Sequence, residues 1–186
     1  MIFISECTQA NVYSVSRKSI KNIKNLENFT PKTATVNGVA IVDETQRNCL
    51  VHHDNFFLDL NFDHHDMNFN LLNTQFELLG YPIGGFFNVH RDRQRDAKHK
   101  YTILVYPKST YTGGDLILKD SLENATSVTV IETSKFTTWM VVIFSIDLYH
   151  ESKEVISGSK YVFKSEIYVN ENSLREEKYE DSQLAD

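Results

Sequence analysis

His90 and Asp92 form an H-x-D pair whose two side chains could bind one metal ion. Side chains alternate along a strand, so positions two residues apart share one face and can reach the same ion. His150, at the end of a long apolar strand, would supply a third ligand. Two imidazoles and one carboxylate form the facial set that leaves coordination positions open on iron(II). Alone, an H-x-D pair is weak support, because such triplets arise by chance.

Short apolar runs separated by turn residues recur from residue 76 onward, as in a sandwich or barrel of antiparallel strands. Nine tyrosines and twelve phenylalanines, against three prolines and seven glycines, also favour aromatic-rich strands. Gly84-Gly85 and Gly113-Gly114 supply the backbone freedom that tight turns need. The expected strands cover residues 76–81, 86–89, 101–106, 115–118, 128–131, 138–145 and 161–169, with two earlier strands at 38–43 and 48–51.

Residues 16–29 carry apolar side chains three positions apart, which predicts an amphipathic helix that Pro31 would end. A weaker helix is expected over residues 67–72. We therefore predict an α+β fold in which N-terminal helices support a C-terminal β structure. The chain would form a single domain over residues 1–175, with its motifs in residues 76–169, followed by an acidic tail at 176–186 that frays into solvent.

The 186 residues are 41% hydrophobic and 24% charged, as expected of one globular domain with a substantial core. A net charge of −6 argues against a general phosphate-binding surface but leaves room for a local basic patch. With Cys7 and Cys49 as its only cysteines, the chain favours a reducing compartment, and one bridge between them is the alternative. We find no signal peptide and no membrane span, so we expect a soluble, intracellular protein of the cytoplasm or nucleus.

The segment YPIGGFFNVHRD, residues 81–92, resembles the iron-binding stretch of the prolyl 4-hydroxylase-like branch of the 2-oxoglutarate/Fe(II)-dependent dioxygenase superfamily. The resemblance continues on the next strand through Thr102, Leu104 and Tyr106, and in YTGGDL, residues 111–116, which matches a Y-x-G-G-x-L turn. It closes with His150 and with Lys160 ten residues later. The similar region spans residues 76–169, about half of the chain, with the family's spacings kept.

This resemblance implies a double-stranded β-helix, or jelly roll, in which His90, Asp92 and His150 bind Fe(II). Lys160 would anchor the distal carboxylate of 2-oxoglutarate, and one charge-assisted contact of this kind is worth about 1.5–3 kcal/mol. The implied reaction consumes O2, releases succinate and CO2 and hydroxylates a substrate, with ascorbate as an accessory reductant. Further co-substrate contacts would come from hydroxyl donors and apolar walls: Tyr81, Thr102, Tyr106, Leu104 and Leu116.

Two segments depart from the family's pattern. Glu166 stands where prolyl hydroxylases usually have a tryptophan, and by alternation it shares a face with Lys160 and Lys164. We expect Lys164 and Glu166 to line the substrate side of the pocket or to pair with each other; alternatively, their strand lies at a sheet edge and they meet water. The basic loop at residues 91–100, with Arg93 and Arg95, could steer an acidic peptide or a polynucleotide toward the metal, or be an ordinary solvated loop.

The remaining histidines have simpler interpretations. His52, His53, His64 and His65 form two adjacent pairs, and neighbouring residues on a strand point to opposite faces, so we interpret them as structural or surface residues. His99 is expected to be solvated, and Trp139 with residues 140–144 should belong to the core.

The leading hypothesis is a hydroxylase of a prolyl or another side chain of a polypeptide. The first alternative is nucleic-acid demethylation of the AlkB type, whose R-x-N-x-T-x-R ending is absent from residues 160–166. Others are a catalytically silent jelly-roll binding module and a cupin-like metal protein of different function. The sequence leaves the oligomeric state open.

Overall fold

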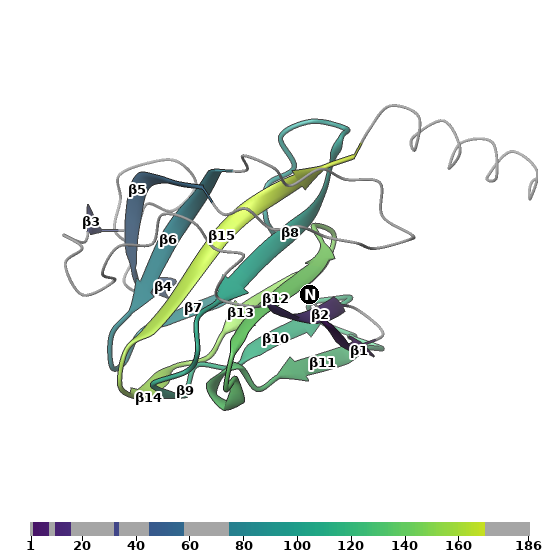
Figure 1. The fold of residues 1–186 in the computed structure, drawn as a ribbon. Helices are drawn as coiled ribbons and strands as arrows, with labels where there is room; N and C mark the ends of the chain where they lie inside the picture. The colour runs from purple at the N-terminus through teal and green to yellow at the C-terminus, as the bar shows by residue number, and fades with distance from the viewer. Residues whose placement is uncertain (1, 8–9, 16–31, 34–44, 58–74, 170–186) are drawn as a thin grey trace, which may run out of the picture.

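The computed structural model describes residues 2–7, 10–15, 32–33, 45–57 and 75–169, and these residues are almost entirely β-structure (Figure 1). The only helix among them is the short 3-10 helix η3 (Thr133–Lys135), so none is long and apolar enough to cross a bilayer. The helices predicted at 16–29 and 67–72, the strand predicted at 38–43 and the tail at 176–186 lie outside the described residues. The N-terminal supporting helices of the expected α+β fold therefore remain a prediction.

The larger of the two main sheets has eight strands, and every neighbouring pair in it is antiparallel. An N-terminal hairpin extends it, because the second strand of that hairpin pairs with the long apolar strand at residues 139–145. In spatial order the strands are β1 (Ile2–Cys7), β2 (Ala10–Val15), β12 (Trp139–Ser145), β8 (His99–Tyr106), β15 (Lys160–Tyr168), β6 (Gln75–Tyr81), β5 (Leu50–Phe57) and β3 (Lys32–Thr33).

The smaller main sheet has five strands and carries the H-x-D segment. Its order is β11 (Val128–Ile131), β10 (Leu116–Lys119), β13 (Tyr149–Ser152), β7 (Phe86–His90) and β4 (Arg47–Asn48). A separate pair of short strands, β9 (Thr112–Gly113) and β14 (Val155–Ser157), joins the turn after β8 to the turn before β15. Two antiparallel sheets with these crossovers form a jelly-roll-like fold.

The two main sheets pack face to face around one apolar cluster. Leu104 of β8 and Val142 of β12 contribute from the larger sheet, and Leu118 of β10 from the smaller one. The intervening residues of the larger sheet, among them Ile103 and Val105, belong to a second buried cluster on its opposite face. Strands buried on both faces need near-continuous apolar sequence, which is why residues 140–144 are all buried as predicted.

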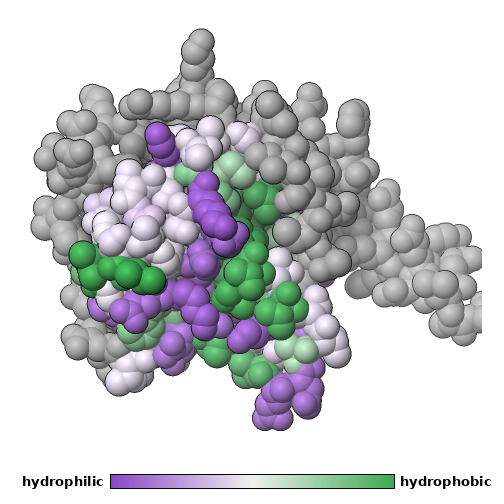
Figure 2. Space-filling view, turned by 90° about the horizontal axis from the view of Figure 1, so that it is seen from below, coloured by the Kyte–Doolittle hydropathy of each residue, from purple (hydrophilic) through white to green (hydrophobic). Residues whose placement is uncertain are grey.

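The surface seen from below in Figure 2 alternates between apolar and polar residues, and its apolar patches are separated by hydrophilic ones. Exposed apolar side chains include Ile83, Val130 and Ile156. Single exposed apolar residues of this kind are common on soluble proteins and need no special explanation.

Candidate metal centre

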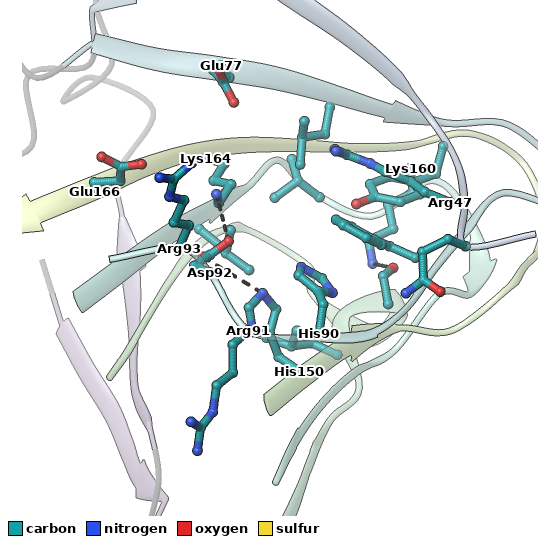
Figure 3. A pocket seen from close by; sticks show the side chains of 18 of the residues that line it. Arg47, Glu77, His90, Arg91, Asp92, Arg93, His150, Lys160, Lys164 and Glu166 are labelled. Atoms are coloured by element: carbon teal, nitrogen blue, oxygen red, sulfur yellow. Dashed lines mark hydrogen bonds and ion pairs between the residues drawn. The ribbon is translucent and has the colours of Figure 1, made fainter. Parts of the chain in front are cut away.

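Two of the three predicted ligands are fixed by strand pairing. His90 ends β7 and is the direct cross-strand partner of His150 in β13, and their ring centroids lie 4.1 Å apart. Asp92 follows β7 by two residues and places Oδ2 3.8 Å from His150 Nε2. One potential ligand atom from each of the three residues lies within 4.8 Å of the others. The structure therefore brings His90, Asp92 and His150 together, with their side chains pointing toward one another (Figure 3).

Both imidazoles are held in the form that can bind a metal. His90 Nδ1 donates to the carbonyl oxygen of Asn88 at 2.8 Å, and His150 Nδ1 donates to that of Leu148 at 3.3 Å. These bonds leave each Nε2 with its lone pair free for a metal. Burial, and then the charge of His150, lower the pKa of His90 to about 3. Burial likewise lowers the pKa of His150, although the Asp92 carboxylate opposes it. Both rings are therefore neutral at pH 7.

The Asp92 carboxylate is held on both oxygens. Lys164 Nζ lies 2.9 Å from Oδ1, and the Thr102 hydroxyl donates to Oδ2 at 2.5 Å. Burial alone would raise the pKa of Asp92, but the Lys164 ammonium, His150 and the Thr102 hydroxyl together outweigh it and hold that pKa well below its usual range. The Thr102 hydroxyl, expected to contact the co-substrate, is bonded here to a candidate metal ligand, and its contact with a co-substrate stays a prediction.

Lys160 is an almost completely buried cation, with 1% of its surface exposed. Its Nζ donates to the carbonyl oxygen of Gly114 and, at 2.7 Å, to the Ser152 hydroxyl. The same nitrogen lies 5.1 Å and 5.5 Å from the ring centroids of Tyr81 and Tyr106. Burial lowers the pKa of Lys160 to about 7, although Asp115 and Cys49 oppose this. Buried cations are stable only with an anionic or strongly hydrogen-bonding partner, so this end of the site is suited to an anion.

Gly114 gives the lysine its space. The residue has a φ of +70°, and a Cβ there would lie 3.1 Å from the Cδ of Lys160. Any other residue would be strained in this conformation and would also crowd the lysine chain. The Y-x-G-G-x-L turn singled out in the sequence therefore contributes a carbonyl oxygen and an open path to the Lys160 site.

One cavity of about 730 Å³ contains the three candidate ligands and Lys160. Its walls also include most of the residues expected to contact a co-substrate, namely Tyr81, Leu104, Tyr106 and Leu116. Burial raises the pKa values of Tyr81 and Tyr106 above their usual range, so both phenols stay protonated and can donate hydrogen bonds. Figure 3 shows the three ligands grouped together, with Lys160 further along the pocket.

The residues predicted for a substrate line the same cavity: Arg93, Arg95, Lys164 and Glu166. Lys164 and Glu166 belong to β15, which lies between β8 and β6, so the alternative of an edge strand is wrong. Lys164 and Glu166 do not pair with each other. Lys164 contacts Asp92, whereas Glu166 accepts from Arg95 Nε at 3.0 Å and from the Tyr168 hydroxyl at 2.7 Å.

Ser152 and Arg47 are among the cavity residues that sequence patterns missed. Ser152 stands two positions after His150 and shares its face, so alternation could have identified it. Arg47 lies in the two-residue strand β4, and only the pairing of β4 with β7 brings it to the site. No local pattern in the sequence signals that pairing.

His99 was expected to be solvated, and this is wrong. The side chain is completely buried at the start of β8 and stacks on Tyr168, with ring centroids 5.3 Å apart. Neither ring nitrogen has a hydrogen-bond partner. The basic residues around His99 suggested exposure, but β8 begins at this position and the ring is buried in the core.

Cys49 is buried and free, so the alternative bridge to Cys7 does not form.

No protein-family model matches the chain. No curated protein matches it in sequence either. Solved structures similar to it include a Pseudomonas putida prolyl-4-hydroxylase, with 15% identity and a TM-score of 0.46 over 69% of this chain and 76% of that chain. A prolyl hydroxylase from Trichoplax adhaerens, in complex with a hypoxia inducible factor oxygen degradation domain peptide fragment, gives 15% identity and a TM-score of 0.45 over 67% and 64%.

A 2OG-Fe(II) oxygenase family oxidoreductase from Burkholderia pseudomallei gives 12% identity and a TM-score of 0.40 over 50% of this chain. The alignment spans 41% of the Burkholderia chain, which is less than half of its length.

Proposed function

We propose that this protein is an Fe(II)- and 2-oxoglutarate-dependent dioxygenase that hydroxylates a prolyl or another side chain of a polypeptide, releasing succinate and CO2. The observation that carries the proposal is the convergence of His90, Asp92 and His150 in one cavity that also contains the buried cation Lys160. A facial set of two imidazoles and a carboxylate is typical of non-haem Fe(II) sites. A buried lysine beside it is suited to a ligand that bears a carboxylate.

Each residue of the site would have a distinct role in this reaction. When bound, Fe(II), 2-oxoglutarate and O2 would supply the oxidising chemistry. His90 and His150 would offer neutral Nε2 atoms, and Thr102 and Lys164 would orient the Asp92 carboxylate by their contacts with its two oxygens. Lys160 would bind the distal carboxylate of the co-substrate. The remaining contacts would come from donors and apolar walls of the cavity: Tyr81, Tyr106, Leu104 and Leu116.

The cavity wall beyond Asp92 is the proposed place of the polypeptide. Glu166 and Lys164 line it from β15, and Arg93 and Arg95 line it from the loop after β7. If the arginines attract an acidic peptide, binding should weaken more steeply with salt in the wild type than in an Arg93/Arg95 double Ala variant. Equal slopes would remove the steering role while leaving the chemistry untouched.

The test of the chemistry is succinate formation by the purified protein with Fe(II), 2-oxoglutarate, O2 and ascorbate. Slow turnover is expected even without a substrate, and Asp92→Ala should abolish both turnover and binding of Mn(II) in place of iron. Asp147→Ala is the matched control, because Asp147 is an exposed carboxylate on the turn between β12 and β13. A wild-type protein that binds Mn(II) but neither binds nor consumes 2-oxoglutarate would refute the proposal and favour a metal protein of other function.

The choice between polypeptide and nucleic-acid substrates needs a separate readout. Proline-containing peptides should increase succinate release and gain one oxygen atom, as measured by mass spectrometry. Methylated oligonucleotides should do neither. Stimulation by the oligonucleotides alone would replace the polypeptide assignment with demethylation.

A further inference from the structure

Six cations and three carboxylates line the cavity, although the whole chain has a net charge of −6. Among the cations, Lys164 is paired with Asp92 and Arg95 with Glu166. Arg91 lies over the Tyr149 ring, 4.1 Å from its centroid, and Arg93 is exposed to solvent. Lys160 is the proposed co-substrate anchor. This leaves one half-buried cation of the cavity, Arg47, to be explained.

Two contacts fix the Arg47 guanidinium in place, and neither of them is an ion pair. Its Nε donates to Cys49 Sγ at 2.8 Å, and its central carbon lies 4.3 Å from the centroid of the Phe87 ring. Among the residues that the structure describes, no carboxylate forms an ion pair with Arg47, although the charge of Glu77, the third carboxylate of the cavity, acts on it through space. A guanidinium carries five donors and keeps its charge at any physiological pH. The four N–H groups other than Nε–H would be the donors to a ligand that enters the cavity.

Phe87 sets the place of this cation relative to the metal centre. The Phe87 ring stacks on His90, with centroids 3.6 Å apart and planes 17° apart. Two groups cannot occupy the same face of a ring at such distances, so Phe87 lies between His90 and Arg47. The Phe87 ring would therefore separate an anion bound at Arg47 from the candidate metal ligand His90. Such an anion would belong to a ligand that extends past the metal centre.

We propose that Arg47 binds a carboxylate of a ligand in this cavity, forming an anion site in addition to Lys160. The carboxylate has two possible sources, because both the co-substrate and an acidic side chain of a polypeptide substrate could present one. The planar fork of a guanidinium matches a carboxylate with two parallel hydrogen bonds, so the group adds orientation as well as affinity. The proposal rests on the proposed function for its ligands but not for its geometry.

The test compares ligands that differ in one carboxylate, with Mn(II) in place of iron and without oxygen. For the co-substrate, 2-oxoglutarate is compared with 2-oxopentanoate, which has the same chain length and no distal carboxylate. For the substrate, a Glu-Pro repeat peptide is compared with a Gln-Pro repeat peptide. In one of these two pairs, Arg47→Gln should weaken binding of the acidic ligand by about 10- to 100-fold, as expected for loss of a charge-assisted contact. Binding of the neutral ligand of that pair should not change. Arg47→Lys should keep part of the affinity for the acidic ligand.

Lys108→Gln is the matched control, since it removes the same charge from an exposed position outside the cavity. Mn(II) affinity should be unchanged in all three variants. If Arg47→Gln leaves every affinity of the folded protein unchanged, or weakens neutral and acidic ligands alike, Arg47 is structural and the proposal is wrong. If the wild type fails to bind 2-oxoglutarate while the Glu-Pro peptide still binds in an Arg47-dependent way, the proposed function fails and the Arg47 site stands.

Discussion

Replacing Lys160 by methionine should make the ligand-free protein less sensitive to pH. Lys160 is 1% exposed, and burial lowers its pKa from an ordinary value of 10.5 to about 7, with Asp115 and Cys49 opposing. Between these two values the unfolded chain binds a proton that the folded chain has lost. The free energy of unfolding of the wild type therefore rises with pH across this window. One pKa unit corresponds to about 1.4 kcal/mol, so the gain from pH 7 to pH 9 is about 2–3 kcal/mol.

The assay is urea denaturation of the metal-free wild type and of Lys160→Met at several pH values from 6.5 to 9. Methionine keeps an unbranched apolar chain of nearly the same length and removes the ammonium, so the difference between the two curves isolates this group. Lys108→Met, an exposed lysine, should run parallel to the wild type. Parallel curves for the wild type and Lys160→Met would refute the conclusion that burial lowers the pKa of this ammonium. With Mn(II) already present, addition of 2-oxoglutarate should stabilise the wild type more than the variant, which keeps the three candidate metal ligands but lacks the ammonium.

Three further outcomes follow from the contacts around the site. Burial lowers the pKa of His90 to about 3, so the unfolded chain takes up a proton below pH 6.5 that the folded chain does not. The metal-free protein should lose stability as the pH falls from 7 to 4, and His90→Ala should reduce that loss in urea denaturation. Thr102→Val removes the 2.5 Å donor to Asp92 and should weaken Mn(II) binding about 10-fold in calorimetry, with Thr102→Ser restoring it. Gly158 has a φ of +76° and would place a Cβ 2.3 Å from the Thr110 carbonyl oxygen, so Gly158→Ala should lower the free energy of unfolding by about 1–3 kcal/mol.

The sequence predicted the strands whose burial is strongest. Residues 140–144 are apolar without interruption because β12 is covered on both faces, and this leaves a pattern that needs no partner to be recognised. In β13 the sequence Tyr-His-Glu-Ser carries no such pattern, because its place is set by pairing with β10 and β7. The N-terminal hairpin was missed for a similar reason: β2 is short, its apolar residues do not alternate cleanly with polar ones, and its long-range pairing with β12 defines it.

The candidate site divides in the same way. His90 and Asp92 are close in sequence, and His150 and Lys160 keep a fixed spacing, so motifs could identify all four. Other residues of the site are distant from these four in the sequence: Lys164 contacts Asp92 from β15, and Arg47 lines the cavity from β4. Such contacts depend on sheet order, which a local pattern does not contain.

The pairing of His90 with His150 ties the state of the site to the backbone of the smaller sheet. β7 and β13 touch through only a short, irregular register, with a shift between His150 and Ser152. An ion that coordinates both imidazoles would act as a cross-link between these two strands. Amide hydrogens along β7 and β13 should then exchange with deuterium more slowly in the metal-loaded protein than in the metal-free protein. The exchange rates of β8 and β12 should be the same with and without metal.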